Sequence, residues 1–166
     1  MARQLRPVGV DFAGTARLRM TFTAVLAAGP EAVYRALAED VTAWPQWFRA
    51  VTLARPAETA GRRGRVIGLA GGVRFAETIM AAEPSRRYTY RIDRTNVPAV
   101  RGMLEDWRLS PAGAGTALSW TVALDAPPPV RWLLRLARPA FRRAFRQAVG
   151  CLDVRLAGLS RSTGRS

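Results

Sequence analysis

Two glutamates and two tyrosines stand out because each falls on the apolar side of a segment that alternates between apolar and polar residues. Glu77, Glu105, Tyr88 and Tyr90 all occupy such positions. Since successive side chains of a strand point to opposite faces, all four are expected on the inner face of a sheet. An unpaired buried carboxylate is costly, so each glutamate must meet an arginine or a tyrosine, or hold a raised pKa inside a cavity.

These four side chains are the candidate catalytic residues. A glutamate in an apolar setting can be the general acid or base of a cyclisation or dehydration, while Tyr88 or Tyr90 donates a hydrogen bond to a substrate carbonyl. A structural interpretation competes with this one: each glutamate forms a salt bridge near a strand end, or a bulge reverses the alternation. The sequence leaves both interpretations open, and the structural one describes the more common situation.

The residue types that are absent restrict the chemistry further. The chain has no histidine and no lysine, so a Ser-His-Asp or Cys-His arrangement and a lysine Schiff base are excluded. The single cysteine, Cys151, cannot form an internal disulfide or a zinc site by itself. We therefore expect no metal and no cofactor, and any proton transfer must use Asp, Glu, Tyr or water, with Arg stabilising charge.

The alternating segments that carry these residues predict an antiparallel sheet. Short turn sequences such as Gly71-Gly72 separate the segments and favour hairpins. The Gly- and Arg-rich stretch 57–64 is also predicted to be a turn. The predicted strands are 16–26, 51–54, 65–69, 73–81, 87–93, 102–110 and 115–124.

Helices are predicted after the first strand and at the end of the chain. Pro30 suits the first turn of a short helix, and a second short helix carries Trp44 and Trp47. The segment 130–159 has the longest helical pattern, with Pro139 predicting a kink or a break near Arg138. Its apolar stripe is Trp132, Leu136, Phe141, Phe145, Val149, Leu152, Leu156 and Leu159, and its basic stripe is Arg131, Arg135, Arg138, Arg142 and Arg146.

This order of elements, with the motifs G-P-E-A-V-Y-R-A-L, W-P-Q-W, E-T-I-M-A-A-E-P-S-R-R-Y-T-Y-R-I and G-A-G-T-A-L-S-W, resembles the START-like superfamily called SRPBCC. That superfamily includes polyketide cyclases and dehydrases and lipid-transfer domains. The resemblance implies an α+β helix-grip fold, a curved antiparallel sheet of about seven strands around a long C-terminal helix, with two short helices after the first strand. We expect an arm over 1–15, one ligand-binding domain over 16–159 and a flexible tail over 160–166.

The resemblance also implies a cavity between the sheet and the long helix. The five tryptophans, Trp132 among them, are candidates to line it, although such residues more often form core. The candidate ligand-binding residues are Phe75, Met103, Trp107, Trp120, Phe141 and Phe145.

Composition bears on partners and location. All 26 basic residues are arginine, and the net charge is +14. Because Ala, Gly and Pro are also abundant, we attribute this charge mainly to composition and a solvated face, and do not expect a nucleic-acid partner. No secretory signal is evident, which predicts a cytoplasmic protein. The oligomeric state is open.

Three functions follow from these features. The first is binding of a hydrophobic small molecule, such as a lipid or a polyketide, in the interior cavity. The second is a polyketide cyclase, aromatase or dehydratase that uses the cavity glutamates and tyrosines. The third takes the arginine stripe beside Trp132 as a surface for an anionic membrane or nucleic acid.

Overall fold

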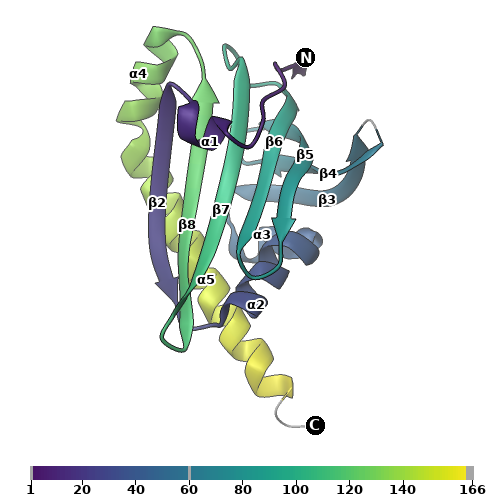
Figure 1. Ribbon diagram of the computed structural model, residues 1–166, viewed down its shortest axis with the longest axis vertical. Coiled ribbons are helices and arrows are strands. Elements are labelled where there is room, and N and C mark those ends of the chain that lie inside the picture. Colours follow the sequence, from purple (N-terminus) through teal and green to yellow (C-terminus); the bar gives the residue numbers. More distant parts are fainter. Residues whose placement is uncertain (1, 60, 164–166) are drawn as a thin grey trace.

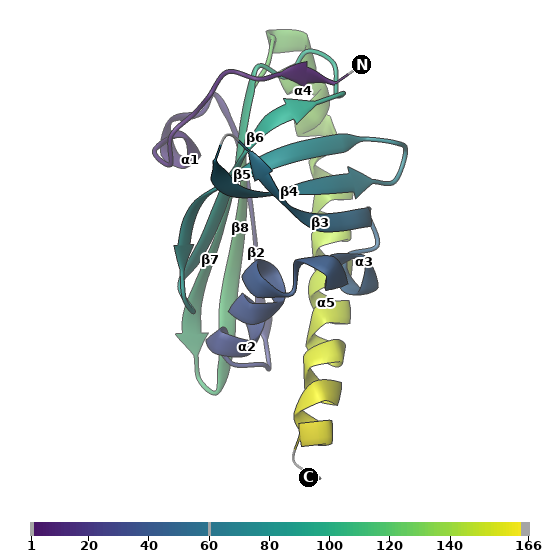
Figure 2. The ribbon, with the colours of Figure 1, turned by 90° about the vertical axis from the view of Figure 1, so that its right-hand side faces the viewer.

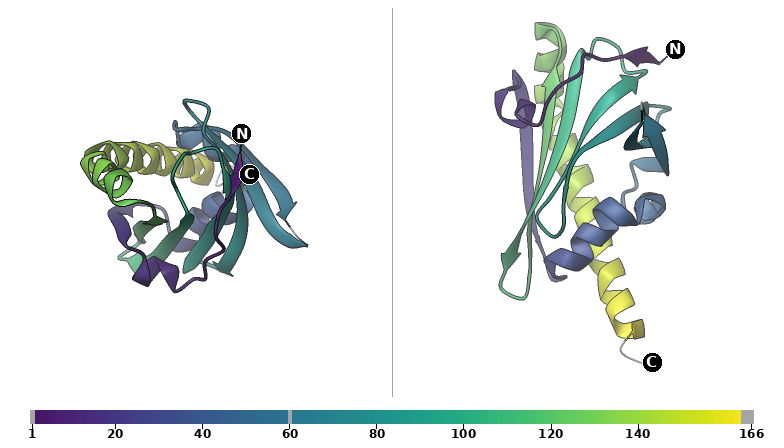
Figure 3. Two further views of the ribbon diagram at one scale, coloured as in Figure 1. Left: turned by 90° about the horizontal axis from the view of Figure 1, so that it is seen from above. Right: turned by 45° about the vertical axis from the view of Figure 1, so that its right-hand side comes forward.

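The computed structural model describes residues 2–59 and 61–163 and contains a curved antiparallel sheet with the C-terminal helix along its concave side (Figures 1 and 3). In this part of the chain the sheet order is β2-β8-β7-β6-β5-β4-β3, and β1 pairs separately with β6. The predicted helix-grip architecture is confirmed. The strands are β1 Arg3–Gln4, β2 Leu18–Leu26, β3 Val51–Thr59, β4 Arg62–Leu69, β5 Arg74–Glu83, β6 Arg87–Thr95, β7 Gly102–Ala112 and β8 Gly115–Asp125.

The hairpin between β3 and β4 is longer than the sequence predicted. The turn expected over 57–64 is wrong for most of its length, because β3 continues to Thr59 and β4 begins at Arg62. The two strands pair through this stretch, with Glu58 opposite Arg63, and opposite charges across a strand pair stabilise it. Pro56 is compatible with β3 because this strand is at the edge of the sheet.

The short helices after β2 close the lower end of the barrel-like curve (Figure 2). They are α2 Pro30–Tyr34, a π-helical turn over Arg35–Glu39, a 3-10 turn over Val41–Ala43, and α3 Trp44–Trp47. Val33 and Leu37 are fully buried, and the indole nitrogen of Trp44 donates to the Leu37 carbonyl at 3.1 Å. This bond fixes α3, and with it the Trp44 ring, against the core.

The C-terminal helical segment consists of two helices, α4 Pro128–Leu136 and α5 Arg138–Thr163. The break falls at Ala137, which confirms the prediction made from Pro139, a residue that has no N–H to continue the helix. The expected apolar stripe is wrong at both ends, because Trp132 and Leu136 are 63% and 57% exposed at its start and Leu159 is 50% exposed at its end. Helix α5 continues to Thr163, where a tail was expected from Ser160, and residues 164–166 lie outside the described residues.

The N-terminal arm is held against the rest of the protein near each of its two ends. Strand β1 pairs with the end of β6, α1 spans Phe12–Thr15, and Leu5 and Val8 are buried between these elements. Among the described residues, no helix combines the length and the apolar character that a membrane span requires.

Strand β8 begins at Gly115, where the backbone lies close to the end of β2, and this close approach gives a stability prediction. A Cβ at Gly115 would overlap the carbonyl oxygen of Leu26, the last residue of β2, whereas a Cβ at Gly150 in α5 would meet nothing. Gly115→Ala should therefore destabilise the protein by about 2 kcal/mol, and Gly150→Ala should stabilise it by about 0.5–1 kcal/mol through helix propensity. Urea unfolding of both variants measures these changes; equal effects would contradict the packing argument.

Candidate functional site

A cavity of about 410 Å³ lies between the concave face of the sheet and the helices α3, α4 and α5. Most of the side chains that line it are apolar. They come from strands β3 to β8, from these three helices and from the α3–β3, β4–β5 and β6–β7 connections. Four lining side chains are polar: Arg65, Glu77, Tyr90 and Glu105. The cavity is thus an apolar space with one cluster of charged and hydroxyl groups.

Two cross-strand pairs bring this cluster together. Arg65 of β4 is directly opposite Glu77 of β5, and Tyr90 of β6 is directly opposite Glu105 of β7. In the β5–β6 ladder Glu77 is opposite Ile92 and Tyr90 is opposite Ile79, so no directly opposed pair of this ladder joins two residues of the cluster. Four neighbouring strands therefore supply one polar residue each to the same region of the inner face.

The guanidinium of Arg65 is held by one carboxylate and by aromatic rings. Its Nε donates a hydrogen bond to Glu77 Oε2, and both side chains are almost completely buried. The guanidinium carbon lies 4.1 Å from the centroid of the Trp44 ring and 4.0 Å from that of Tyr90. Cation–π attraction at these distances offsets part of the cost of removing the charge from water.

Glu105 is held by a separate set of neutral donors. The Tyr90 hydroxyl donates to Glu105 Oε2 at 2.6 Å, and the Trp120 indole nitrogen donates to the same oxygen at 2.9 Å. The Trp107 indole nitrogen donates to the Tyr90 hydroxyl oxygen at 3.0 Å. The Tyr90 proton is therefore engaged by Glu105 and is not available to a substrate carbonyl in this arrangement.

Two buried side-chain nitrogens lack a hydrogen-bond partner among residues 2–59 and 61–163: Trp47 Nε1 and Arg65 Nη1. Trp47 does not line the cavity, whereas Arg65 does. A buried guanidinium N–H without an acceptor is costly, and an oxygen atom of a bound molecule would satisfy it. The cavity thus has one donor for which the described residues supply no acceptor.

Burial controls the ionisation of the cluster. Desolvation raises the pKa of Glu77 to about 7, outweighing the attraction of Arg65. Desolvation also raises the pKa of Glu105, although the bonds from Tyr90 and Trp120 oppose the change. Burial alone would lower the pKa of Arg65, but the Glu77 carboxylate raises it above the ordinary value, so this side chain stays charged. Glu77 can therefore gain or lose a proton near neutral pH.

Most of the residues predicted for the site lie at the cavity. Glu77, Glu105 and Tyr90 line it, as do the predicted ligand-binding residues Phe75, Met103, Trp120 and Phe141. The remaining three, Tyr88, Trp107 and Phe145, are buried but do not line it.

Packing explains why those three residues are behind the cavity wall. Trp107 and Phe145 stack on Trp120 with ring centroids 5.2 Å and 5.8 Å away, so Trp120 separates them from the space. Tyr88 packs against Tyr90 at 5.5 Å. They support the lining residues and do not contact the cavity themselves.

Sequence reasoning did not single out Arg65 or Phe48 as part of the site. Of the five candidate tryptophans, only Trp44 and Trp120 line the cavity. Arg65 shares the alternation of Ile67 and Leu69, which places it on the inner face. That pattern was the available signal, and it was obscured because arginine is abundant throughout the chain.

A second charged cluster lies on the outer face of the sheet and is internally satisfied. Asp106 accepts hydrogen bonds from Arg87 at 2.7 Å, Thr89 at 2.5 Å and Arg108 at 2.8 Å. Burial would raise the pKa of Asp106, but these bonds lower it below its ordinary value. In the described part of the chain, no three Cys, Asp or Glu side chains are grouped as a metal site would require.

The comparison with protein families agrees with this architecture. The model of the family described as polyketide cyclase / dehydrase and lipid transport matches residues 17–157. A Mycobacterium tuberculosis protein described as uncharacterized is 32% identical over 162 residues, which cover 93% of this chain and 96% of that protein.

Solved structures show the same fold at low sequence identity. A START superfamily protein from Mycobacterium smegmatis superposes with a TM-score of 0.65 at 14% identity, covering 85% of this chain and 98% of that one. The ginseng major latex-like protein 151 from Panax ginseng gives a TM-score of 0.58 at 10% identity, covering 78% and 97%. These similarities establish the fold of the chain.

The raised pKa of Glu77 predicts how stability depends on pH. Between about pH 4.5 and pH 7 the folded protein keeps a proton that the unfolded chain has released, so the free energy of unfolding falls as pH rises through this window. Across this pH window the free energy of unfolding of the wild type should fall by roughly 3 kcal/mol relative to that of the Glu77→Gln variant. Urea titrations at several pH values measure the difference, with Glu83→Gln as an exposed control on the same strand. A pH-independent difference would show that Glu77 stays ionised.

Proposed function

Because the chain belongs to the polyketide cyclase / dehydrase and lipid transport family, we propose that it binds a hydrophobic small molecule in the cavity between the sheet and the C-terminal helices. The main support is the cavity itself: about 410 Å³, apolar except for one polar cluster. This volume is in the range of small-molecule sites. Apolar surface that a ligand brings into such a space is removed from water, which favours binding.

The polar cluster indicates the kind of molecule. Arg65 Nη1 has no acceptor among the described residues, so a ligand with an oxygen acceptor at one end would make a charge-assisted hydrogen bond there. The rings of Trp44, Phe48, Trp120 and Phe141 offer flat surfaces along the rest of the lining. The proposed ligand is therefore a mainly apolar molecule with a carbonyl, carboxylate or phenolic oxygen, which fits both a polyketide and a fatty acid.

The ionisation of Glu77 decides which oxygen is preferred. When Glu77 is ionised, the Arg65–Glu77 pair is neutral overall, and a neutral carbonyl oxygen is enough to accept the hydrogen bond from Arg65. When Glu77 is protonated, the Arg65 charge is unbalanced and favours a carboxylate. Since the pKa of Glu77 is about 7, a carboxylate ligand should bind more tightly as pH falls below this value, until the ligand itself is protonated.

A cavity-filling variant tests the proposed site. Ala144 of α5 lines the cavity, whereas Ala157 of the same helix is exposed. Ala144→Phe should abolish the quenching of tryptophan fluorescence by 2-naphthoate and should remove small molecules that co-purify with the wild type in native mass spectrometry. Ala157→Phe should change neither result.

Replacing Arg65 tests the recognition of oxygen. Arg65→Met should weaken 2-naphthoate binding by about tenfold or more and leave 2-methylnaphthalene binding nearly unchanged, because only the carboxylate uses the guanidinium. Tyr88→Phe is the matched control, since Tyr88 is buried near Arg65 but does not line the cavity. Binding that survives Ala144→Phe would show that these probes bind elsewhere.

A second candidate function, an intramolecular aldol cyclisation or dehydration of a polyketide, is favoured by the pKa of Glu77. As a general base, the Glu77 carboxylate would take a proton from a methylene group between two carbonyls, and the electron pair would move to the enolate oxygen beside Arg65. The enolate carbon would then attack a second carbonyl of the same chain, and the alkoxide formed would take the proton back from Glu77. Loss of water would follow if the regenerated Glu77 carboxylate then removes the remaining proton of the attacking carbon and passes it to the hydroxyl group, so that the C–O bond breaks, a C=C bond forms and water leaves.

Catalysis of this kind predicts a specific ranking of variants. With a poly-β-keto substrate, Glu77→Gln should slow cyclisation by about 10²-fold or more, because general acid–base catalysis typically contributes that much. Glu105→Gln should have a smaller effect, because Glu105 is already held by Tyr90 and Trp120. Product profiles from liquid chromatography measure the rates. Profiles unchanged in both variants would remove these glutamates from any mechanism and leave the binding function.

A further inference from the structure

Helix α4 has an apolar face that nothing in the described structure covers. Trp132, Leu133 and Leu136 are 63%, 62% and 57% exposed, although all three belong to one helix of nine residues. The helix lies at one end of the molecule, above α5 and beside the start of β2 (Figures 1 and 2). Exposed large apolar residues grouped in this way are typical of a surface that binds something apolar.

Lining the cavity accounts for only one of the two apolar faces of helix α4. Val130 and Leu134, one turn apart, line the cavity and account for the inward face. Trp132 and Leu136, also one turn apart, occupy a different face that points to solvent. Helix α4 is therefore apolar on two sides, one of which closes the cavity while the other is unpartnered.

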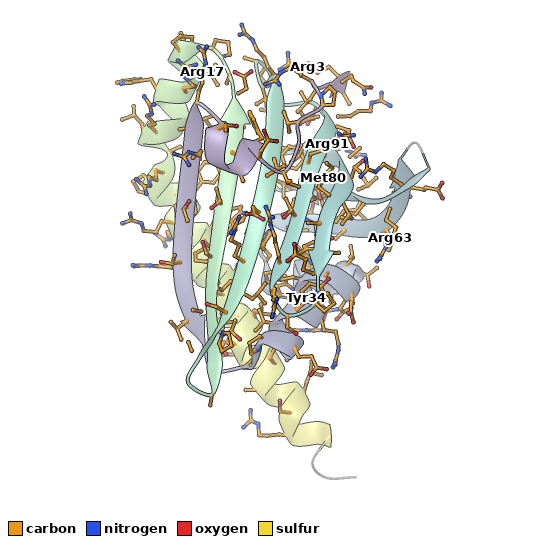
Figure 4. The ribbon with its side chains drawn as sticks, viewed as in Figure 1. Arg3, Arg17, Tyr34, Arg63, Met80 and Arg91 are labelled. Carbon is orange, nitrogen blue, oxygen red and sulfur yellow. The ribbon has the colours of Figure 1, made fainter. Side chains whose placement is uncertain are left out.

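A basic groove lies next to this face. Arg17 and Arg19 of the β2 segment and Arg135 and Arg138 of the helices line one surface groove. None of the four forms an ion pair with another described residue, and the sequence has no Asp or Glu from Ala126 to Leu152. Figure 4 shows Arg17 at the end of β2 that is beside α4. Four unneutralised guanidinium groups thus adjoin three exposed apolar side chains.

We propose that α4 and the basic groove form a docking surface for an anionic phospholipid bilayer. The helix would lie in the plane of the interface, with Leu133 and Leu136 below the headgroups and the Trp132 indole at their level. The guanidinium groups of Arg17, Arg19, Arg135 and Arg138 would contact lipid phosphates. Interfacial helices combine an apolar face that carries Trp and Leu with a flank of arginines in this way, and indole rings favour the level of the headgroups.

The charge distribution argues against the other occupants of this face. A second copy of the chain would bring a second set of guanidinium groups next to the first, and none of the described acidic residues lines this groove to balance either set. A nucleic acid would satisfy the arginines but leave Leu133 and Leu136 without an apolar partner. An anionic bilayer supplies phosphates and acyl chains side by side, and it satisfies both features.

The proposed docking depends on the surface alone and holds whatever the cavity binds. Its position nevertheless has a consequence for the cavity, because Val130 and Leu134 belong to the same helix. On a bilayer, α4 would separate the cavity from the acyl chains by the thickness of one helix.

Vesicle sedimentation of the full chain tests the proposal. At low ionic strength the protein should sediment with vesicles of phosphatidylcholine and phosphatidylglycerol but not with pure phosphatidylcholine, and salt should release it. Leu133→Ser should greatly reduce binding, whereas Val25→Ser, at a residue 70% exposed on β2, should not. The blue shift of tryptophan emission that accompanies binding should disappear in Trp132→Phe, because Trp132 is 63% exposed.

A charge-matched pair of double variants separates this groove from the net charge. Arg135→Gln with Arg138→Gln should lower the vesicle affinity by more than about tenfold, since each arginine near a membrane surface contributes about fivefold. The double variant Arg55→Gln with Arg62→Gln removes the same charge from the exposed β3–β4 hairpin, and it should lower the vesicle affinity much less. Circular dichroism melting confirms that each variant is folded.

Several results would overturn the proposal. These are a failure to sediment with anionic vesicles, an equal loss of affinity in the two double variants, and retention of duplex DNA or RNA without vesicle binding. A dimer in light scattering that Trp132→Ala dissociates would instead assign the face to a second copy. The naphthoate titration is a separate measurement, so either proposal can fail while the other stands.

Discussion

The buried guanidinium of Arg65 is the constraint on which the interior depends. Removing this charge from water is costly, and four neighbouring groups offset the cost: the Glu77 carboxylate and the rings of Trp44, Tyr90 and Tyr88. Trp44 reaches Arg65 only because α3 is fixed against the core, and Tyr90 is itself held by Glu105 and Trp107. Much of the inner wall is therefore ordered around one cation.

The same constraint explains why the interior is not packed solid. A core filled with aliphatic side chains would leave Arg65 Nη1 permanently without an acceptor. A cavity allows a ligand oxygen to supply one. The aromatic rings keep the remaining wall rigid, because Trp107 and Phe145 stack behind Trp120 and hold it in place. Rigid walls and a guanidinium N–H that no described residue accepts are the features on which the proposed binding of a mainly apolar molecule rests.

Arginine has three different environments in this chain, and its tertiary setting decides its role. Arg65 is buried in the cavity wall, while Arg87 and Arg108 neutralise Asp106 on the outer face. Arg135 and Arg138 line a groove to which none of the described acidic residues contributes a side chain. A bias in composition can supply the arginines, but a local shortage of Asp and Glu, as in the segment after Asp125, leaves some of them free for an anionic partner.

Alternation and proline placement by themselves determined the sheet, the break before Pro139 and the inward position of Glu77, Glu105 and Tyr90, because these follow from local backbone geometry. The length of the β3–β4 hairpin was mispredicted because cross-strand pairing overrode a turn-like composition. Only the tertiary structure decided that Glu77 meets Arg65, that Tyr88, Trp107 and Phe145 lie behind the cavity wall, and that Trp132 is exposed. Those outcomes depend on the register between strands and on which face of a helix meets the sheet. Neither can be derived from the spacing of residues along one segment.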